Sequence, residues 1–195
     1  MARKTGTSAA ETGARIHAAA LRLFAEQGYD AVSMRQIAGE AGVQAGAIYL
    51  HTKDKQTLLF SLMTAFLQAR QDALAPLSTE DSPNARIKGF VQGHLALTRA
   101  NPDAARLVQN EARALEGDYA AIVGAFEAGY RRHLMELLAQ GREADAFQVP
   151  DEALIADAIL ALLNHVPDWQ TAHPEFPQEK LDRIHENMIR RILKS

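Results

Sequence analysis

Apolar residues recur every three to four positions along most of the chain, which is the spacing of one face of an α-helix. Residues 9–27 carry Ile16, Leu23 and Phe24 at this spacing and are followed by Gly28. Residues 151–166 repeat the pattern with a wider apolar face. No stretch alternates apolar and polar residues convincingly with the period of two that a half-buried strand requires. The pattern therefore predicts an all-α fold.

Capping residues and prolines divide this pattern into about nine helices. Ser33 and Gln36 have the spacing of a capping box, and Ser82-Pro83 and Asn101-Pro102 place an N-cap before a proline at the first helical position. Asp54 and Asp151 are expected to cap two further helices. The expected helices cover residues 9–27, 33–41, 44–50, 54–76, 83–99, 102–115, 118–140, 151–166 and 178–194.

Three segments between or beside these helices carry expectations of their own. Residues 1–8 are expected to form a polar arm. Gly141 is expected to close the helix over residues 118–140. Prolines 167, 174 and 177 are expected to break the chain around Trp169.

Composition supports a helical chain and narrows its chemistry. Of 195 residues, 36 are alanine, the best helix former. The absence of cysteine excludes disulfides, thiolate metal sites and cysteine nucleophiles. The N-terminal residues show no secretory apolar region, and the longest apolar run, 158–163, is far shorter than the roughly 20 residues of a membrane span. A cytoplasmic protein without a membrane partner is expected.

Charge is distributed unevenly along the chain. Residues 1–55 hold 7 basic and 5 acidic residues, a net +2, while residues 56–195 hold 14 and 19, a net −5, and together they give −3. A basic N-terminal part on an acidic body indicates where a polyanion would bind. A solvated helix face would give the same distribution, so charge alone leaves both interpretations open.

Residues 33–50 have the pattern of a helix-turn-helix motif. Gly42 lies where the tight turn is expected to need a positive φ, and Ala38 is small where the two helices must cross. The apolar residues Ile37, Val43 and Ile48 are expected to pack against the first helix. From spacing alone, a plain helical hairpin in a bundle is an equal alternative.

The outward face of the third helix carries side chains that suit DNA. Gln44 can bond an adenine edge, and Ala45 or Ala47 can contact a thymine methyl group. Polar and basic side chains just beyond can bind phosphates. The expected DNA-binding set is Ser33, Arg35, Gln44, Ala45, Gly46, Ala47, Tyr49, His51, Lys53 and Lys55.

The stretch from Ile16 to Leu59 resembles the DNA-binding domain of the TetR family of bacterial repressors. The matching motifs, in order, are AALRLFAEQGY at residues 19–29, SMRQIA at 33–38, AGV at 41–43, GAIY at 46–49, Lys55 and Leu58-Leu59. Two residues depart from the family pattern. Thr52 stands where the family usually has an aromatic residue, and Ala45 stands where lysine is common.

The resemblance implies a DNA-binding domain over residues 1–53 and a helical effector-binding and dimerisation domain over residues 54–195. It implies a homodimer through the last two long helices, 151–166 and 178–194, and a double-stranded DNA operator as partner. Two recognition helices must lie about 34–36 Å apart to enter successive major grooves. A small-molecule effector that moves the fourth helix changes this spacing, so a repressor released by its ligand is expected.

The C-terminal body resembles one TetR subgroup more weakly. Its matching segments are residues 111–117, 130–132 and 163–169, and many subgroup members respond to coenzyme A thioesters of fatty or aromatic acids. Gln170 stands where the subgroup often has a second aromatic residue. The expected ligand-binding residues are His94, Glu111, Arg113, Tyr119, Phe126, Tyr130, Asn164 and Trp169.

The sequence also defines the alternatives. Polar residues on apolar helix faces could satisfy one another in the core instead of lining a ligand site. No zinc-protease, serine-hydrolase, P-loop or dinucleotide-binding motif is found, and no histidine pair has ligand spacing, so no enzyme, cofactor or metal site is expected. A helical ligand-binding or scaffold protein with a weak DNA-binding head, a regulator of a multidrug efflux gene, and an activator remain as alternatives.

Overall fold

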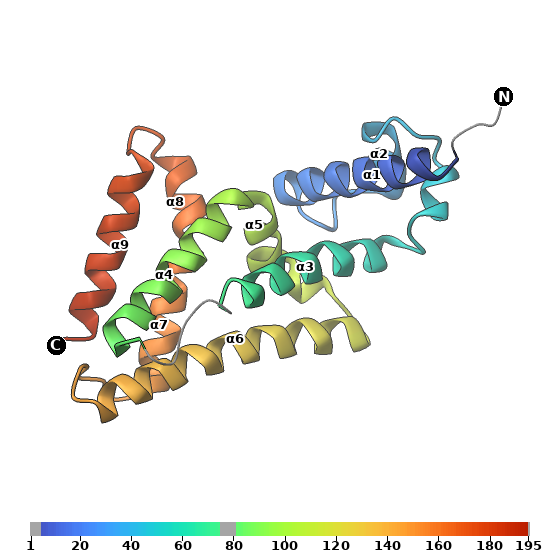
Figure 1. The fold of residues 1–195 in the computed structure, drawn as a ribbon. Helices are drawn as coiled ribbons and strands as arrows, with labels where there is room; N and C mark the ends of the chain where they lie inside the picture. The colour runs from blue at the N-terminus through green and yellow to red at the C-terminus, as the bar shows by residue number, and fades with distance from the viewer. Residues whose placement is uncertain (1–4, 75–80, 195) are drawn as a thin grey trace.

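The computed structural model describes residues 5–74 and 81–194, and within these ranges helices are its only regular secondary structure (Figure 1). The all-α prediction is confirmed. The molecule is elongated, with α1 at one end and α9 at the other. Its nine described α-helices are α1 (Thr5–Gln27), α2 (Met34–Glu40), α3 (Lys55–Asp72), α4 (Pro83–Ala100), α5 (Pro102–Glu111), α6 (Gly117–Glu143), α7 (Glu152–Asn164), α8 (Val166–Ala172) and α9 (Gln178–Ile192), joined by two 3₁₀ turns, η1 (Ala47–Leu50) and η2 (Ala112–Ala114).

Most helix starts lie where the capping residues predict them. The Ser33 hydroxyl accepts a hydrogen bond from the Gln36 backbone N–H, while Gln36 Oε1 accepts one from the Ser33 N–H, which completes the capping box. Asp54, Ser82 and Asp151 cap α3, α4 and α7 by accepting from the backbone N–H three residues later, without the reciprocal bond of a capping box. Asn101 differs, because its side-chain amide instead donates back to the Leu97 carbonyl at 3.1 Å.

Several predicted element limits are wrong. Helix α1 already begins at Thr5, so the polar arm predicted for residues 1–8 is helical from there on, and residues 1–4 lie outside the described ranges. Helix α3 ends at Asp72, and the end predicted at Pro76 lies outside the described ranges. The helix predicted over 102–115 ends at Glu111 and continues only as the 3₁₀ turn η2.

The third helix of the predicted motif is much shorter than expected. Instead of an α-helix over residues 44–50, the chain forms the single 3₁₀ turn η1, with i to i−3 hydrogen bonds such as Ala47 N–H to the Gln44 carbonyl. Gly46 precedes the turn and offers no side chain to cap it.

The break predicted around Trp169 is confirmed in part, and the helix end predicted at Gly141 is wrong. Pro174 and Pro177 lie in the non-helical segment between α8 and α9. Pro167 lies in the first turn of α8, where a missing N–H costs nothing, so Trp169 itself is helical. Gly141 lies inside α6, which continues to Glu143, and it packs against the ring of Phe147. Its lack of a side chain serves close packing here and does not end the helix.

Two apolar cores hold the elements together. The first joins α1, α2, η1 and α3 to α5 and the start of α6, with Phe24, Ile37 and Leu58 among its buried members. The second joins α4, the rest of α6, α7 and α9, with Phe90 and Ile159 among its members. The first core therefore continues well beyond residue 53, and the domain boundary at residues 53/54 stays a prediction.

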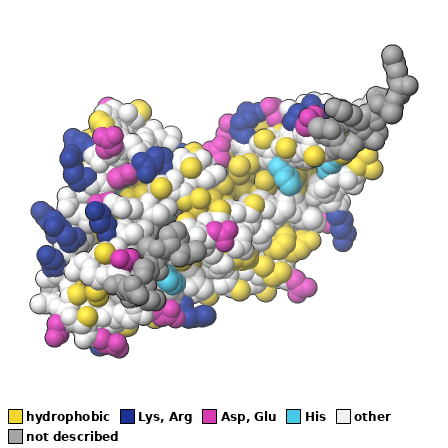
Figure 2. All heavy atoms as spheres, viewed as in Figure 1, with side chains coloured by type: hydrophobic (Ala, Val, Ile, Leu, Met, Phe, Trp, Pro, Cys, Tyr) yellow, Lys and Arg dark blue, Asp and Glu magenta, His cyan; other side chains and the backbone are white. Residues whose placement is uncertain are grey.

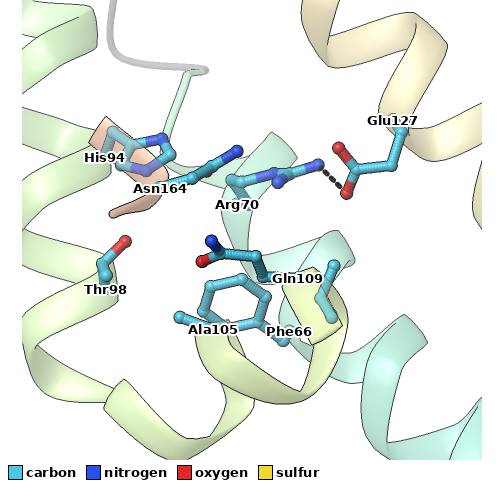
Figure 3. Close-up of a pocket in the computed structure, with 9 residues that line it drawn as sticks. Phe66, Arg70, His94, Thr98, Ala105, Gln109, Glu127 and Asn164 are labelled. Carbon is cyan, nitrogen blue, oxygen red and sulfur yellow. Dashed lines mark hydrogen bonds and ion pairs between the residues drawn. The ribbon is translucent and has the colours of Figure 1, made fainter. Parts of the chain in front are cut away.

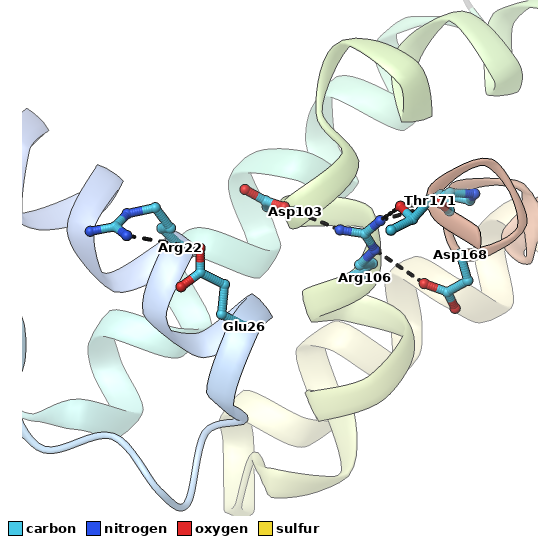
Figure 4. Close-up of polar contacts among 7 residues, drawn as sticks. Arg22, Glu26, Asp103, Arg106, Asp168 and Thr171 are labelled. Carbon is cyan, nitrogen blue, oxygen red and sulfur yellow. Dashed lines mark hydrogen bonds and ion pairs between the residues drawn. The ribbon is translucent and has the colours of Figure 1, made fainter. Parts of the chain in front are cut away.

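Ion pairs fix neighbouring helices at both ends of the first core (Figure 4). Arg22 on α1 pairs with Glu40 on α2 and with Glu26 one turn along. Arg106 on α5 donates from Nε to Asp168 at 3.1 Å and also contacts Thr171, so it holds α8 against α5. Among the helices in the described ranges, none is both long enough and apolar enough to cross a bilayer.

Candidate DNA-binding face and ligand cavity

The turn between α2 and η1 has the geometry that the sequence predicts. Gly42 adopts a φ of +67°, which a residue with a side chain rarely tolerates. Ile37, Ala38 and Ile48 are buried in the first core, and Val43 is half-buried against it. The predicted packing of the two short segments against the first helix is therefore confirmed.

The expected DNA-binding residues lie in or next to the head formed by α1, α2 and η1, and most of them are exposed. The side chains of Ser33, Arg35, Gln44, Ala45, Gly46, Tyr49 and Lys53 are exposed, whereas those of Ala47, His51 and Lys55 are half-buried. Tyr49 is 57% exposed, and its neighbour Leu50, which was not among the expected residues, is 84% exposed. Tyr49 and Leu50 together therefore give η1 an exposed apolar surface.

Lys55 is held in place by the end of α1. Its Nζ lies 4.0 Å from the centroid of the Tyr29 ring and donates to the Asp30 carbonyl at 3.5 Å. Partial burial lowers the pKa of Lys55, and Asp30 and Glu111 act against this. The ammonium group is thus oriented by an aromatic face and a backbone carbonyl.

The joint between η1 and α3 uses a hydroxyl where the family has an aromatic ring. Thr52 is 8% exposed, and its Oγ1 donates to the Asp54 carbonyl at 3.1 Å. Asp54 accepts from the Thr57 N–H at 2.7 Å, and this hydrogen bond lowers the pKa of Asp54. The start of α3 is therefore stabilised by polar contacts.

A cavity of about 260 Å³ lies between the two cores (Figure 3). Five helices contribute to its wall, since α3 and α4 each supply two residues, α5 supplies three, and α6 and α7 supply one each. The lining residues are Phe66, Arg70, His94, Thr98, Ala105, Val108, Gln109, Glu127 and Asn164.

Arg70 is the buried cation of this cavity. Its Nη2 donates to Glu127 Oε1 at 2.7 Å, and its guanidinium carbon lies 4.2 Å from the centroid of the Tyr130 ring. The Nε of Arg70 is buried and makes no hydrogen bond within the described part of the chain. Arg70 therefore joins α3 to α6 and retains an unused donor.

His94 and Tyr130 form a neutral pair beside Arg70. The Nδ1 of His94 lies 3.1 Å from the Tyr130 hydroxyl. Burial lowers the pKa of His94 to about 3, and Arg70 adds to this effect. Burial likewise raises the pKa of Tyr130. Near pH 7 both side chains are uncharged, so they provide hydrogen bonds to the cavity but no charge.

The structure brings only part of the expected ligand set together. His94 and Asn164 line the cavity, and Tyr130 adjoins it through His94 and Arg70. The other five lie elsewhere. Glu111 faces Gly28 of the head, Arg113 is exposed on η2, Tyr119 stacks on Phe60, Phe126 packs against the first core, and Trp169 contacts His173 and Phe176.

Sequence reasoning missed most of the residues that line the cavity. Arg70 was detectable, because it follows Phe66 by four residues on the apolar stripe of α3, where a lone charge needs a partner. The sequence does not mark Glu127, Thr98 and Gln109 in this way, because most polar residues on helices face solvent. Within the described ranges, no cluster of three or more potential metal ligands is found.

Two further surface features lie away from the cavity. A groove of about 650 Å³ runs along α7, α8 and α9, with Leu162, Ile184 and Met188 among its lining. Lysine and arginine side chains gather at the end of the molecule formed by α4 and α9 (Figure 2), where Lys88, Arg190 and Lys194 border a smaller groove. The acidic body thus has a basic end far from the head.

Comparisons with known proteins cover both halves of the chain. Residues 16–62 match the family of bacterial regulatory proteins named tetR, and residues 80–193 match the tetracyclin repressor-like C-terminal domain. The regulator HbdR of Aromatoleum sp. (strain CIB) is 29% identical over 164 residues, which cover 83% of this chain and 70% of that protein. In three other curated regulators, the matched part spans 27%, 38% and 60% of their length.

Solved structures share the whole fold. A tetR-family regulatory protein from Rhodococcus RHA1 superimposes with a TM-score of 0.87 at 25% identity, over 94% of this chain and 97% of that one. AibR, solved with isovaleryl coenzyme A and operator DNA, superimposes with a TM-score of 0.83 at 21% identity, over 91% and 97%. At that identity the second likeness concerns the fold alone.

Proposed function

Since this chain belongs to the TetR family of bacterial transcriptional regulators, we propose that it is a homodimeric repressor that a small-molecule effector releases from its DNA operator. The family consists of DNA-binding regulators and not of enzymes. Beyond membership of the family, the proposal includes repression of transcription, assembly as a homodimer and release by a small-molecule effector. The DNA contacts proposed are those of the head surface described above.

One observation carries the proposal, namely that a single helix joins the head to the cavity. The first half of α3 places Leu58 and Leu59 in the core of the head, and its last turns place Phe66 and Arg70 in the cavity wall. Its 18 residues make a rod about 27 Å long at 1.5 Å per residue. A ligand that displaces Phe66 or Arg70 therefore tilts the head at the other end of the rod.

The tilt acts on DNA through the dimer. Two recognition segments fit successive major grooves only when they lie about 34–36 Å apart. A ligand that favours another separation shifts the population away from the DNA-bound state. The groove along α7, α8 and α9 supports dimerisation, because its lining is mostly apolar. Leu154, in the first turn of α7, is a further apolar side chain that is 67% exposed.

The effector proposed from the resemblance is a fatty or aromatic acid carried as its coenzyme A thioester. The fold shared with AibR, which was solved with isovaleryl coenzyme A, is compatible with this class. The cavity of about 260 Å³ lies just below the range of about 300–1,000 Å³ typical of sites for drug-sized ligands. We therefore place only the acyl or aryl part of the effector inside it.

A DNA titration tests the proposal. The wild-type protein is titrated onto a labelled duplex from the region upstream of its own gene and onto a random duplex, at two salt concentrations. Acyl and aryl thioesters are then added to the complex. We expect saturable, salt-sensitive binding as a dimer, which an effector reverses. Equal affinity for the random duplex would contradict operator recognition, and a complex that no ligand dissolves would contradict effector control.

Two head variants sharpen this titration. Lys55→Ala should reduce the salt slope by about one unit, because one phosphate contact is lost. Tyr49→Ala should weaken binding about fivefold to tenfold without changing thermal stability, since its side chain is largely exposed. Lys88→Ala, which removes a lysine at the opposite end of the molecule, is the matched control. A Lys55→Ala protein with the wild-type slope would remove Lys55 from the phosphate contacts.

A further inference from the structure

Arg70 places a buried cation in the cavity wall, and its Nε donor is not used by any described residue. The side chain is 6% exposed, and its Nε is buried without a partner in the part of the chain that the structure describes. An unsatisfied buried donor is costly, so an acceptor atom at this point is favoured. The guanidinium lies between Asn164 and Glu127 in the cavity wall (Figure 3).

The unused donor lies on an edge that matches a carboxylate. In a planar guanidinium, Nε–H and Nη2–H point the same way and bind the two oxygens of one carboxylate together. Glu127 accepts from Nη2 at 2.7 Å and makes no hydrogen bond to Nε. A ligand carboxylate that takes both donors would form the stronger, bidentate pair and compete with Glu127 for Nη2.

The two partners of the ion pair differ in their access to water. Arg70 is nearly enclosed, while the Glu127 side chain is 41% exposed. A displaced Glu127 can turn into solvent and keep its charge hydrated, whereas Arg70 cannot leave and would keep a counter-ion in the ligand. The exchange therefore leaves no buried charge unpaired, which is the condition for burying an anion at all.

The rest of the wall limits the size and charge of the ligand. Arg70 and Glu127 are the charged residues among the nine that line the cavity, because His94 is held neutral by its burial. Phe66, Ala105 and Val108 provide an apolar surface for one ring or a short branched chain. A volume of about 260 Å³ holds such a group together with a carboxylate.

We infer that the effector acts as a small, ionised carboxylic acid, whose carboxylate replaces Glu127 on Arg70. The inference rests on the proposed function, keeps its repressor and its cavity, and replaces the thioester with the free acid as the effector. Binding breaks the ion pair between α3 and α6. The cavity end of α3 is then released from α6 while the head stays attached to the other end, which couples the ligand to DNA binding.

Calorimetric titration of the full-length protein tests the chemistry of the ligand. The probes are isovalerate, benzoate and 3-phenylpropanoate, the primary amides of the same acids, and isovaleryl and benzoyl coenzyme A. We expect at least one acid to bind saturably and its amide, which has the same shape without the charge, to bind at least thirtyfold more weakly. Equal binding of acid and amide, no binding of any acid, or binding of a thioester alone would overturn the inference.

Variants at the ion pair test the exchange itself. Arg70→Gln should reduce the affinity for the acid by at least thirtyfold. Arg70→Lys keeps the charge without the bidentate edge and should reduce this affinity by about tenfold. It replaces Arg70→Gln in the test if that variant does not fold. Glu127→Gln removes the competing charge and should tighten binding of the acid about tenfold. Arg132→Gln, an exposed change on the same helix as Glu127, is the control. Weaker or unchanged binding by Glu127→Gln would overturn the exchange.

The DNA titration separates this inference from the proposed function. If operator DNA binds and a thioester releases it while acids do not bind, the repressor stands and the carboxylate inference falls. If an acid binds with the expected dependence on Arg70 while no specific DNA binding is found, the ligand site stands and the repressor falls.

Discussion

At the scale of single residues, burial decides what the polar groups of the body do. His94, Arg70 and Tyr130 lie within one cluster, and each is buried. The same histidine on a helix surface would titrate near neutral pH, whereas here its pKa falls to about 3. Its environment therefore turns a potential pH sensor into a fixed neutral hydrogen-bond partner.

His94 should make the stability of the fold depend on pH. Its pKa is about 3 in the folded chain, whereas the unfolded chain keeps the ordinary histidine pKa of 6.5, so between these values the unfolded chain binds more protons. The stability that His94 contributes is thus complete above pH 6.5 and is lost as the pH falls towards 3, by up to about 1.4 kcal/mol per pH unit.

Urea denaturation at pH 7 and pH 5 measures this contribution. Between these two pH values, wild type should lose about 2 kcal/mol more of its unfolding free energy than His94→Gln. If His94→Gln and wild type lose the same amount, the imidazole is not held neutral in the folded state.

At the scale of elements, helix starts were easier to predict than helix ends. A helix start depends on one side chain that accepts a hydrogen bond from the backbone N–H three residues later, as at Ser33 and Asp54. Such a capping residue can be identified in the sequence. An end depends on what packs beyond the helix. Gly141 shows the difference, because the glycine that would ordinarily mark an end is required by the Phe147 ring while α6 continues.

Substitution of Gly141 tests this packing role. A Cβ at residue 141 would overlap the Phe147 ring, so Gly141→Ala should lower the unfolding free energy by about 1–3 kcal/mol. Gly124→Ala on the same helix meets no atom within 4 Å and should raise it by about 0.5–1 kcal/mol. Thermal or urea denaturation measures both. A stabilising Gly141→Ala would show that Phe147 does not occupy this space.

At the scale of the whole molecule, the two cores and the helix that joins them suggest how distant sites communicate. Helix α3 packs beside α6 and connects the head with the cavity (Figure 1). The apolar groove on α7, α8 and α9 is the dimer face proposed above. In this proposal, head, cavity and dimer face act through one chain of packed helices.

A charge in the groove should separate the subunits without unfolding them. Ile184 is 38% exposed and lines the groove, so Ile184→Lys would force a lysine into the proposed interface and should weaken the dimer more than tenfold. Light scattering after size-exclusion chromatography gives the mass. Ile122→Lys on α6, where the isoleucine is 42% exposed outside the groove, is the control. A dimer that survives Ile184→Lys would place the interface elsewhere.

The sequence by itself determined the helical class, most helix starts and the head. These depend on local features: the period of apolar residues, capping side chains, and a glycine with positive φ at residue 42. The resemblance of residues 16–59 then identified the motif, and the family matches agree with it. Such features involve residues a few positions apart, so they can be predicted from the chain alone.

Only the tertiary structure decided the cavity, the 3₁₀ form of η1 and the helix around Trp169. The cavity joins Arg70, His94, Glu127 and Asn164 from four helices, and no local pattern places such residues together. Whether a polar side chain on a helix is solvated, paired or aimed into a cavity depends on which helices pack against it. The packing of the helices into both cores decides these surroundings. For this reason Arg113 and Glu111 have the sequence pattern of cavity residues but lie outside the cavity.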